Sequence, residues 1–402
     1  MKVLFVCAQS PWPARSGTPI RSQGWIKTAA QFLEVGLVAL TRSRAEAALA
    51  SEAERHCAYV RIVMEPLAKR QQVHARLLAL TRLMPFYYQE YWSRPLQRAV
   101  SAAISEWHPD AVQAEWIGSA HYLDAPLADS IPCIYSSHNL EHLVVAGPNA
   151  GLRRLLAWPF ARQMGRVERT WAERAALVAC VTKAEADWFK LVNPCSHFVP
   201  NALMVRDYHF KSPLERQGGP VAFIGHLGYP PNQAAAVALG RQVYPHLRRS
   251  RPDLQCVIAG LKPNREVLSL VGDGVAVYDN VENMAAIWSR ISLLICPLTW
   301  GAGSRIKLLE AAAYGVPIVA TPVSVEGLNF RPDLDYMAAN SPIEMAEKAL
   351  ELILDCHKAK ALAHRARETV LLEHDWAALI PRLQKLYAAV GGSGVRIRDE
   401  SQ

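Results

Sequence analysis

Short apolar runs recur along this chain and alternate with longer stretches of helical character. In the first half they lie at 2–8, 35–41, 57–63, 110–116, 131–136, 175–182 and 197–203. Apolar runs of this length are typical of parallel strands that are covered on both faces. The stretches between them predict helices, the first from about Ile20 to Leu33. Alternating strands and helices predict a doubly wound α/β sheet.

Residues 205–220 interrupt this pattern. They are polar, contain two prolines and a Gly-Gly pair, and predict a linker. A second α/β series follows, with strands near 221–224, 254–260, 275–281 and 293–297, then helices near 342–356, 357–372 and 374–390. We therefore expect a domain at 1–204 and another at 221–373, with the helix 374–390 packing back on the first. A length of 402 residues suits two cores.

Composition narrows the class of protein. Hydrophobic residues make up 51% and charged residues 20%, which is typical of a globular chain. The net charge is +8, and residues 1–200 carry 22 Lys+Arg against 16 Asp+Glu. This excess is too scattered for a nucleic-acid reader, but it fits a protein that handles anionic small molecules or rests on an anionic membrane.

The cysteines and the hydropathy pattern indicate a compartment. Eight cysteines form no CxxC pair and no metal-ligand spacing, which favours a reducing compartment and no bound metal. No apolar run approaches the roughly 20 residues that a membrane helix needs. We expect a cytoplasmic protein.

Two helical stretches combine basic and aromatic residues. Residues 67–107 and 151–171 interleave Lys and Arg with Leu, Phe, Tyr and Trp. Such a surface is a candidate interface with an anionic membrane. Ordinary amphipathic helices with a solvated basic face remain the alternative, so peripheral attachment is one hypothesis of two.

The stretch 292–328 carries the clearest candidate chemistry. After the strand, Gly301 and Gly303 form a loop in which backbone N–H groups can approach a ligand. Ser304 is a candidate N-cap for a helix that begins at Arg305. The helix ends at Gly315, which Pro317 follows.

Two cations at the start of this helix predict an anion site. Arg305 and Lys307 oppose the helix dipole there and call for a compensating anion. Glu310 follows Lys307 by three residues and shares its face of the helix. A phosphate-bearing ligand with a hydroxylated part would suit these groups.

Three other strand-end loops carry polar or glycine-rich sequence. His138, Asn139, Glu141 and His142 follow a strand and favour hydrogen bonding or acid/base work. The loop Gly225–Gly228, with Asn232, is expected near the Gly301–Glu310 loop. The first loop holds Gly17, flanked by Arg15 and Arg21, but lacks the G-x-G-x-x-G pattern of dinucleotide folds.

The later motifs resemble a known family. The sequence G-x-G-x-R-x-K-L-L-E-A-x-A-x-G-x-P-I-V-A-T, followed by E-G-L, resembles the donor-binding segment of family 4 retaining glycosyltransferases. It is most similar to a branch found in bacterial polysaccharide clusters, and F-I-G-H-L-G-Y-P-P-N resembles the start of that branch's C-terminal domain. The match covers about 221–330. The resemblance implies the GT-B fold, two Rossmann-like domains facing a central cleft.

The resemblance also implies roles for individual residues. The enzyme would transfer a sugar from a nucleotide-diphosphate sugar to a glycan or lipid-linked acceptor, without a metal, in surface polysaccharide biosynthesis. Arg305 and Lys307 would hold the diphosphate, Glu310 the ribose, and His138 would belong to a catalytic loop near the transferred sugar. The two domains would close over the donor. The remaining implied donor contacts are Gly17 from the opposite domain, Gly225, Gly301, Gly303, Ser304, Glu326, Gly327 and Leu328.

Several features leave alternatives open. The family often carries a glutamate eight positions before the ribose-binding one, and here that position is Ala302, so sugar selectivity and activity are in question. A non-catalytic glycan- or lipid-binding protein of the same fold is one rival, and a nucleotide-sugar epimerase or hydride-transferring enzyme is another. Asp333 and Asp335 form a D-x-D pair far from the glycine loop, and we interpret it as coincidence.

Overall fold

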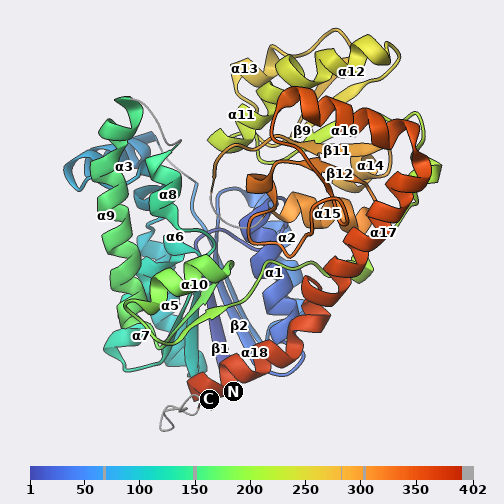
Figure 1. Cartoon of the computed structure of the whole chain (residues 1–402). Coiled ribbons are helices and arrows are strands. Elements are labelled where there is room, and N and C mark those ends of the chain that lie inside the picture. The colour runs from blue at the N-terminus through green and yellow to red at the C-terminus, as the bar shows by residue number, and fades with distance from the viewer. Residues whose placement is uncertain (67–68, 148–151, 282, 302–304, 392–402) are drawn as a thin grey trace. The chain divides into compact units, whose positions relative to one another are not determined.

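The chain folds into two compact units. The computed structural model describes residues 1–66, 69–147, 152–281, 283–301 and 305–391. One unit comprises Met1–Pro200 with Leu379–Gln402, and the other comprises Asn201–Ala378 (Figure 1). The chain therefore passes from the first unit to the second once and returns once.

The first unit is built on a seven-stranded parallel sheet of order β3-β2-β1-β4-β5-β6-β7. Helices cover both faces of this sheet (Figure 1). Its strands are β1 (Lys2–Cys7), β2 (Glu34–Thr41), β3 (Tyr59–Met64), β4 (Ala111–Glu115), β5 (Cys133–Ser136), β6 (Leu177–Cys180) and β7 (Ser196–Phe198). Its main helices are α1 (Gly17–Ala29), α2 (Arg44–Ala50), α3 (Lys69–Thr81), α4 (Phe86–Glu90), α5 (Arg94–Trp107), α6 (Ile117–Ala120), α7 (Asp124–Ala128), α8 (Glu141–Ala146), α9 (Leu152–Arg174) and α10 (Lys183–Lys190).

Burial on both faces explains the unbroken apolar runs. Leu4 and Val6 belong to the core cluster that includes residues of β4, α5 and α6. Val3 and Phe5, which point to the opposite face, are also fully buried. α1 begins at Gly17, earlier than the expected Ile20, because the first turn of a helix tolerates a proline such as Pro19.

The second unit repeats the plan with a six-stranded parallel sheet of order β10-β9-β8-β11-β12-β13. Its strands are β8 (Val221–Ile224), β9 (Cys256–Gly260), β10 (Val275–Asp279), β11 (Leu293–Cys296), β12 (Ile318–Ala320) and β13 (Met337–Ala338). Its main helices are α11 (Pro230–Ala238), α12 (Tyr244–Ser250), α13 (Arg265–Leu268), α14 (Met284–Trp288), α15 (Ile306–Tyr314), α16 (Pro342–Leu354) and α17 (Cys356–Glu373).

Both sheets share one topology. In each, the first strand of the unit lies next to the fourth, and the chain winds outward in both directions from that pair. The prediction of two doubly wound α/β sheets is confirmed. At such a reversal of strand order the following loops diverge, and open α/β sheets bind ligands there. The carboxyl ends of β1 and β4, and of β8 and β11, are therefore candidate ligand-binding positions.

Residues 205–220, the expected linker, lie within the second unit. Arg216 is buried and donates to the backbone oxygens of Lys211 and Tyr314, at 3.0 and 2.6 Å. A further guanidinium N–H donates to the oxygen of Trp288. The segment thus satisfies carbonyls at the ends of α14 and α15, and the chain changes units at Pro200–Asn201 instead.

The last helix, α18 (Trp376–Gly391), continues from the second unit into the first. Within the first unit Tyr387 is buried, and its hydroxyl donates to Gln113 Oε1 at 2.6 Å. The indole of Trp25 donates to the same hydroxyl at 2.8 Å. The last helix thereby joins α1 and β4.

Candidate functional site

The loops that follow β8 and β11 form the candidate site of the second unit. Asn232, buried in the first turn of α11, connects them. Its Nδ2 donates to the backbone oxygen of His226 at 3.0 Å, and its Oδ1 accepts from Lys307 Nζ at 2.6 Å. The expected proximity of the two loops is present, and a side chain of α11 holds it.

Lys307 is a buried cation in the first turn of α15. Its Nζ lies 4.2 Å from the centroid of the Phe223 ring. Burial lowers the pKa of Lys307 to about 8, and the charge of Arg305 acts in the same direction. A cation held in this way is stabilised by an anionic ligand.

Arg305 lies next to Gly301. It occupies the N-cap position of α15 and is 8% exposed. Gly301 has φ 133°, and a Cβ there would lie 2.9 Å from Arg305 Nη2. The glycine is therefore needed both for the backbone conformation and for the approach of the guanidinium. The N-cap is thus Arg305 and not Ser304, and α15 begins at Ile306, one residue later than expected. Ala302, Gly303 and Ser304 lie outside the described residues.

Glu310 lies one turn further along α15, after Lys307. Burial raises the pKa of Glu310 to about 7, although the charge of Lys307 opposes the shift. The helix thus presents two cations and then a carboxylate. This order matches a ligand with an anionic part and a hydroxylated part.

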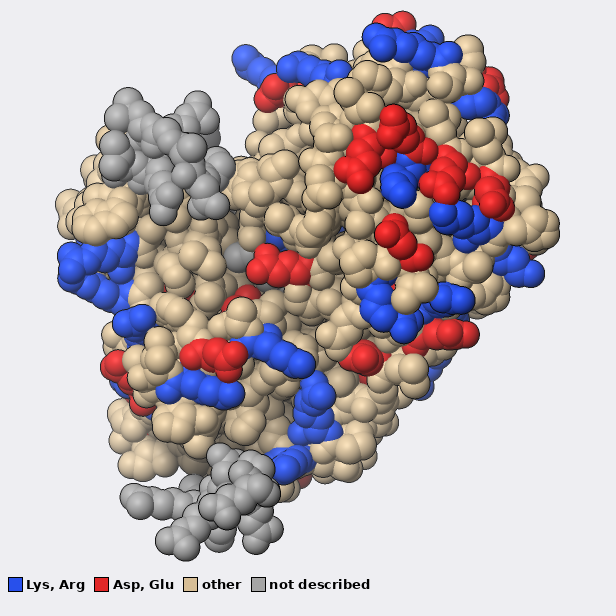
Figure 2. All heavy atoms as spheres, viewed as in Figure 1, with Lys and Arg blue, Asp and Glu red and all other residues tan. Residues whose placement is uncertain are grey.

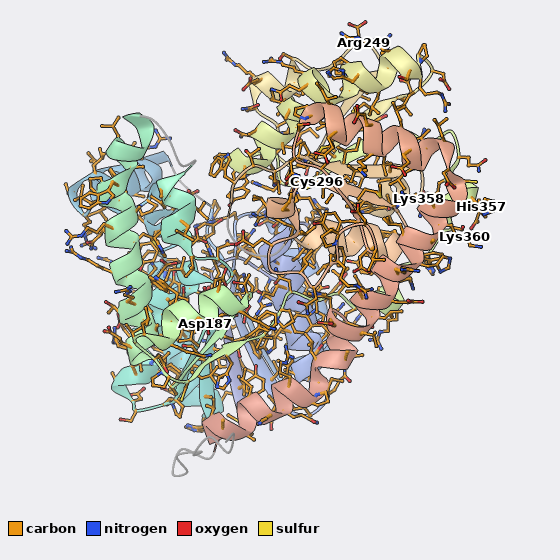
Figure 3. All side chains as sticks on the ribbon, in the orientation of Figure 1. Asp187, Arg249, Cys296, His357, Lys358 and Lys360 are labelled. Carbon is orange, nitrogen blue, oxygen red and sulfur yellow. The ribbon has the colours of Figure 1, made fainter. Side chains whose placement is uncertain are left out.

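The loop after β12 is tied to the end of β11. Ser324 donates to the backbone oxygen of Cys296 at 2.7 Å and accepts from the N–H of Leu298 at 3.3 Å. Figure 3 labels Cys296, the last residue of β11, within the second unit. These bonds fix Ser324, in the turn just before the segment Glu326–Leu328, at that strand end. Glu326 is exposed, Gly327 has φ 80°, and Leu328 is buried.

In the first unit, His138 belongs to the loop after β5 and is buried. Its Nε2 lies 2.9 Å from Glu115 Oε2, at the end of β4. Burial lowers the pKa of His138, and the bond to Glu115 offsets part of the shift. A neutral imidazole donating from Nε2 carries its lone pair on Nδ1, so Glu115 fixes the tautomer.

Glu115 is itself surrounded by donors. Its carboxylate accepts from Ser22 Oγ at 3.0 Å and from Gln113 Nε2 at 2.6 Å. Burial raises the pKa of Glu115, but His138 and Arg21 outweigh this, and the net shift is downward. Glu115 therefore stays ionised. Ser22 comes from α1, whose first residue is the exposed Gly17.

Sequence reasoning did not single out Glu115 as a functional residue. A signal was present, because Gln113 and Glu115 are polar residues two apart in a buried strand, on one face of the sheet. Their partners come from α1, the loop after β5, and α18, and no local pattern indicates those.

Asp335 of the D-x-D pair makes structural hydrogen bonds within the second unit. Asp335 is buried and accepts from the backbone N–H and Nε of Arg331, at 2.7 and 2.9 Å, and from Thr369. It therefore joins the loop before β13 to α17. Among the residues that the structure describes, no group of three His, Cys, Asp or Glu side chains could hold a metal ion. The eight cysteines are free thiols.

Two family models match most of the chain. Residues 219–355 match "Glycosyl transferases group 1", and residues 45–203 match "Glycosyltransferase Family 4". The chain belongs to the group 1, family 4 glycosyltransferases. It is a nucleotide-sugar-dependent glycosyltransferase, as predicted, and the family decides against an epimerase.

Curated relatives of this glycosyltransferase are distant. It is 24% identical over 297 residues to a phosphatidyl-myo-inositol mannosyltransferase of Propionibacterium freudenreichii, a match that covers 69% of this chain and 73% of the relative. It is 23% identical over 165 residues to an uncharacterized 44.6 kDa protein in the cps region of Klebsiella pneumoniae. That match covers 39% of this chain and 42% of the Klebsiella protein.

Solved structures show the same fold. HepE of Anabaena, in a complex with UDP-glucose, has a TM-score of 0.68 at 16% identity, covering 97% of this chain and 100% of HepE. A sucrose-phosphate synthase of Thermosynechococcus elongatus has a TM-score of 0.69 at 15% identity, covering 98% and 100%. The glycosyltransferase has the GT-B fold. None of its described helices is long and apolar enough to cross a membrane.

Proposed function

We propose that this glycosyltransferase moves a sugar, with retention, from a nucleoside-diphosphate sugar to a glycan or lipid-linked acceptor in bacterial surface polysaccharide biosynthesis. The observation that carries the proposal is the pair of buried cations, Arg305 and Lys307, at the start of α15, followed by Glu310. The donor diphosphate would bind the cations and the ribose would bind Glu310.

The chemistry of transfer explains why cations are needed. Departure of a nucleoside diphosphate leaves negative charge on the phosphate oxygens. Arg305, Lys307 and the N-terminus of α15 supply fixed positive charge for it. Glu326, Gly327 and Leu328 would line the donor site near the end of β11, with Gly225 behind Lys307. His138, with its tautomer fixed by Glu115, would serve the transfer step, and Gly17 would contact the donor.

The relatives support the donor and the setting. HepE of Anabaena was solved with UDP and with UDP-glucose. The Klebsiella relative is encoded in a cps region, and a neighbour of similar fold, WaaG, is described as a glycosyltransferase involved in lipopolysaccharide biosynthesis. We therefore propose a UDP-sugar donor. Ala302 replaces the carboxylate that often contacts the sugar, so sugar selectivity would come from other groups.

A two-stage experiment tests the donor site. Thermal shift with UDP-, GDP-, ADP- and CMP-linked sugars identifies the nucleotide, because a ligand that binds the native state raises apparent stability. Transfer of that sugar to an extract that contains the glycan or lipid-linked acceptor is then measured for Arg305→Ala and Glu310→Ala. We expect losses on the order of 10- to 1000-fold in kcat/KM for these two variants.

The matched controls are Arg249→Ala and Glu347→Ala, which remove exposed side chains of the same unit. Figure 3 shows Arg249 on α12, directed outward. Both controls should transfer sugar like the parent. If Arg305→Ala and Glu310→Ala also do so, the proposed donor site is wrong.

We also propose that the first unit rests on an anionic membrane at its cytoplasmic face. Large apolar side chains are exposed on α3 and α9: Leu77 by 58%, Leu80 by 64%, Leu156 by 68% and Trp158 by 58%. The Cζ atom of Arg162 lies 5.6 Å from the centroid of the Trp158 ring. Figure 2 shows Lys and Arg side chains gathered at the outer edge of this unit, beside α9. Apolar side chains flanked by cations are typical of interfacial helices.

Sedimentation with phosphatidylglycerol vesicles tests this contact. Leu156→Ser/Trp158→Ser and Arg162→Ala/Arg166→Ala should both release the protein. The matched control, Leu354→Ser/Leu372→Ser, changes side chains that are 72% and 75% exposed in the second unit, and it should bind like the parent. Equal binding by all variants would contradict the proposal. Arg153 and Arg154 belong to the same predicted basic stretch, but the structure does not describe their side chains.

A further inference from the structure

A buried carboxylate of α9, a helix later in the sequence, holds the loop that carries His138. Glu168 of α9 is fully buried, and its carboxylate bonds to Glu141 and His142, the two residues that open α8. Its Oε1 accepts from the backbone N–H of Glu141 at 2.6 Å. Its Oε2 lies 2.7 Å from His142 Nδ1 and accepts from the His142 N–H at 3.4 Å. Glu168 thus caps the start of α8 from another helix.

A second set of hydrogen bonds, made by the Glu141 side chain, also holds the start of α8. Glu141 Oε1 accepts from the Trp116 indole at 2.6 Å and from Asn139 Nδ2 at 3.3 Å. Trp116 directly follows Glu115, the partner of His138. The segment from His138 to His142 is therefore fixed at one end by β4 and at the other by α9.

Simple packing does not explain a carboxylate at this position. α9 already packs on the core through Met164, Trp171 and Ala172. Burying a carboxylate costs free energy unless hydrogen bonds compensate for it, and an apolar replacement is often neutral or stabilising. What a carboxylate adds is directional bonds, which hold the backbone of the loop in one place.

We propose that Glu168 is a positioning residue for sugar transfer, acting through the His138 loop. This inference rests on the proposed role of His138. Removing the carboxylate frees the first turn of α8 and lets His138 move relative to Glu115. Small displacements of a reacting group are costly, so the turnover step should slow. Nucleotide-sugar affinity should change little, because the proposed diphosphate and ribose contacts are Arg305, Lys307 and Glu310.

The experiment compares Glu168→Ala, Glu168→Gln, His138→Ala and the double variant His138→Ala/Glu168→Ala. Glu173→Ala, on the same helix but exposed, is the matched control. We expect Glu168→Ala to lower kcat by on the order of 10- to 100-fold with the nucleotide-sugar Kd unchanged. Glu168→Gln keeps the shape and one acceptor, and it should recover part of the loss. The double variant should turn over no more slowly than His138→Ala, because residues that act as a unit are not additive.

The outcomes separate this inference from the proposed function. Full activity in His138→Ala would overturn the proposed role of His138 and, with it, the role of Glu168, while the proposed donor site and sugar transfer would stand. Loss in His138→Ala with a normal kcat in Glu168→Gln and Glu168→Ala would overturn the role of Glu168 alone. Additive losses in the double variant would show that Glu168 acts by general stability and would also overturn it. If Glu168→Ala fails to fold, a kcat reduced in folded Glu168→Gln but not in Glu173→Ala supports the proposal, and a kcat equal to the parent overturns it.

Discussion

At the proposed donor site, Lys307 and Glu310 should make nucleotide-sugar binding depend on pH. Lys307 has a pKa of about 8 and Glu310 of about 7, so both are charged together only in a narrow range. We expect nucleotide-sugar affinity to be highest between these values. Above its pKa, Lys307 is neutral in the free protein and no longer attracts the diphosphate. Affinity should then fall by about tenfold per pH unit, until the pH exceeds the higher pKa that Lys307 has in the complex. Titration of Kd across this range checks the profile.

The stability of the ligand-free protein should change with pH in the opposite direction to donor affinity. The folded-state pKa of Lys307 lies below its unfolded value of 10.5, so the unfolded chain binds more protons between about 8 and 10.5. The Lys307 contribution to the free energy of unfolding therefore rises with pH in that window. In Lys307→Met, donor affinity should be weak and independent of pH above 8. Unchanged parental affinity above pH 9 would contradict this account.

Gly225 keeps room for the Lys307–Asn232 pair. A Cβ at residue 225 would lie 2.7 Å from Lys307 Nζ and 3.0 Å from Asn232 Nδ2. Gly225→Ala should displace the lysine and weaken donor binding by roughly tenfold or more, with little loss of stability, since the clash meets flexible side-chain ends. Gly240→Ala, whose added Cβ would lie nearest to the Leu270 side chain, is the control. Isothermal titration measures both, and equal affinities would refute the assignment.

At the scale of single residues, the sequence predicted what is local. Arg305, Lys307 and Glu310 are near neighbours, and the helical pattern alone places them on one helix. The inferred roles of Glu115 and Glu168 depend on hydrogen-bond partners 23 and 27 residues away in the sequence. Because those contacts depend on how strands and helices pack, no short motif indicates them.

At the scale of elements, the end of α15 is set by Gly315, as the sequence indicated. Gly315 has φ 76°, and a Cβ there would lie 2.6 Å from both the Lys211 oxygen and the Phe210 ring. Gly315→Ala combines left-handed strain with a backbone clash, so it should lower the free energy of unfolding by about 3 kcal/mol. Gly218→Ala has φ 75° but open space around it, and it should cost only about 1 kcal/mol. Chemical denaturation of both variants compares them.

The strands were easier to predict than the connections. Buried parallel strands such as β1 and β11 are continuous apolar runs, which hydropathy detects directly. Residues 205–220 look like a linker because their side chains are polar. Arg216 nevertheless uses that polarity to bind carbonyls at the ends of α14 and α15. Composition does not distinguish polar residues that face water from those that satisfy buried backbone groups.

At the scale of the whole molecule, the alternation of strands and helices was sufficient to predict two doubly wound sheets. The order of the strands follows from the rule that crossovers between parallel strands are right-handed and short. The course of α18 depends on more specific contacts. Trp25 and Gln113 are internal to the first unit, and their bonds to Tyr387 bring the end of the chain to them.

The bonds of Tyr387 predict that the stability of the first unit, and not of the second, depends on α18. Tyr387→Phe leaves the Trp25 N–H and Gln113 Oε1 without their buried partner, which should cost about 1–3 kcal/mol. Because Leu379–Gln402 belongs to the first unit, hydrogen exchange should become faster in α1, β1 and β4 and stay unchanged in β8, β9 and β11. Tyr278→Phe, at a side chain that is 43% exposed, is the control. Faster exchange in both sheets of Tyr387→Phe would mean that the two units unfold together, whereas exchange as slow as in the parent would mean that the Tyr387 hydroxyl contributes nothing measurable.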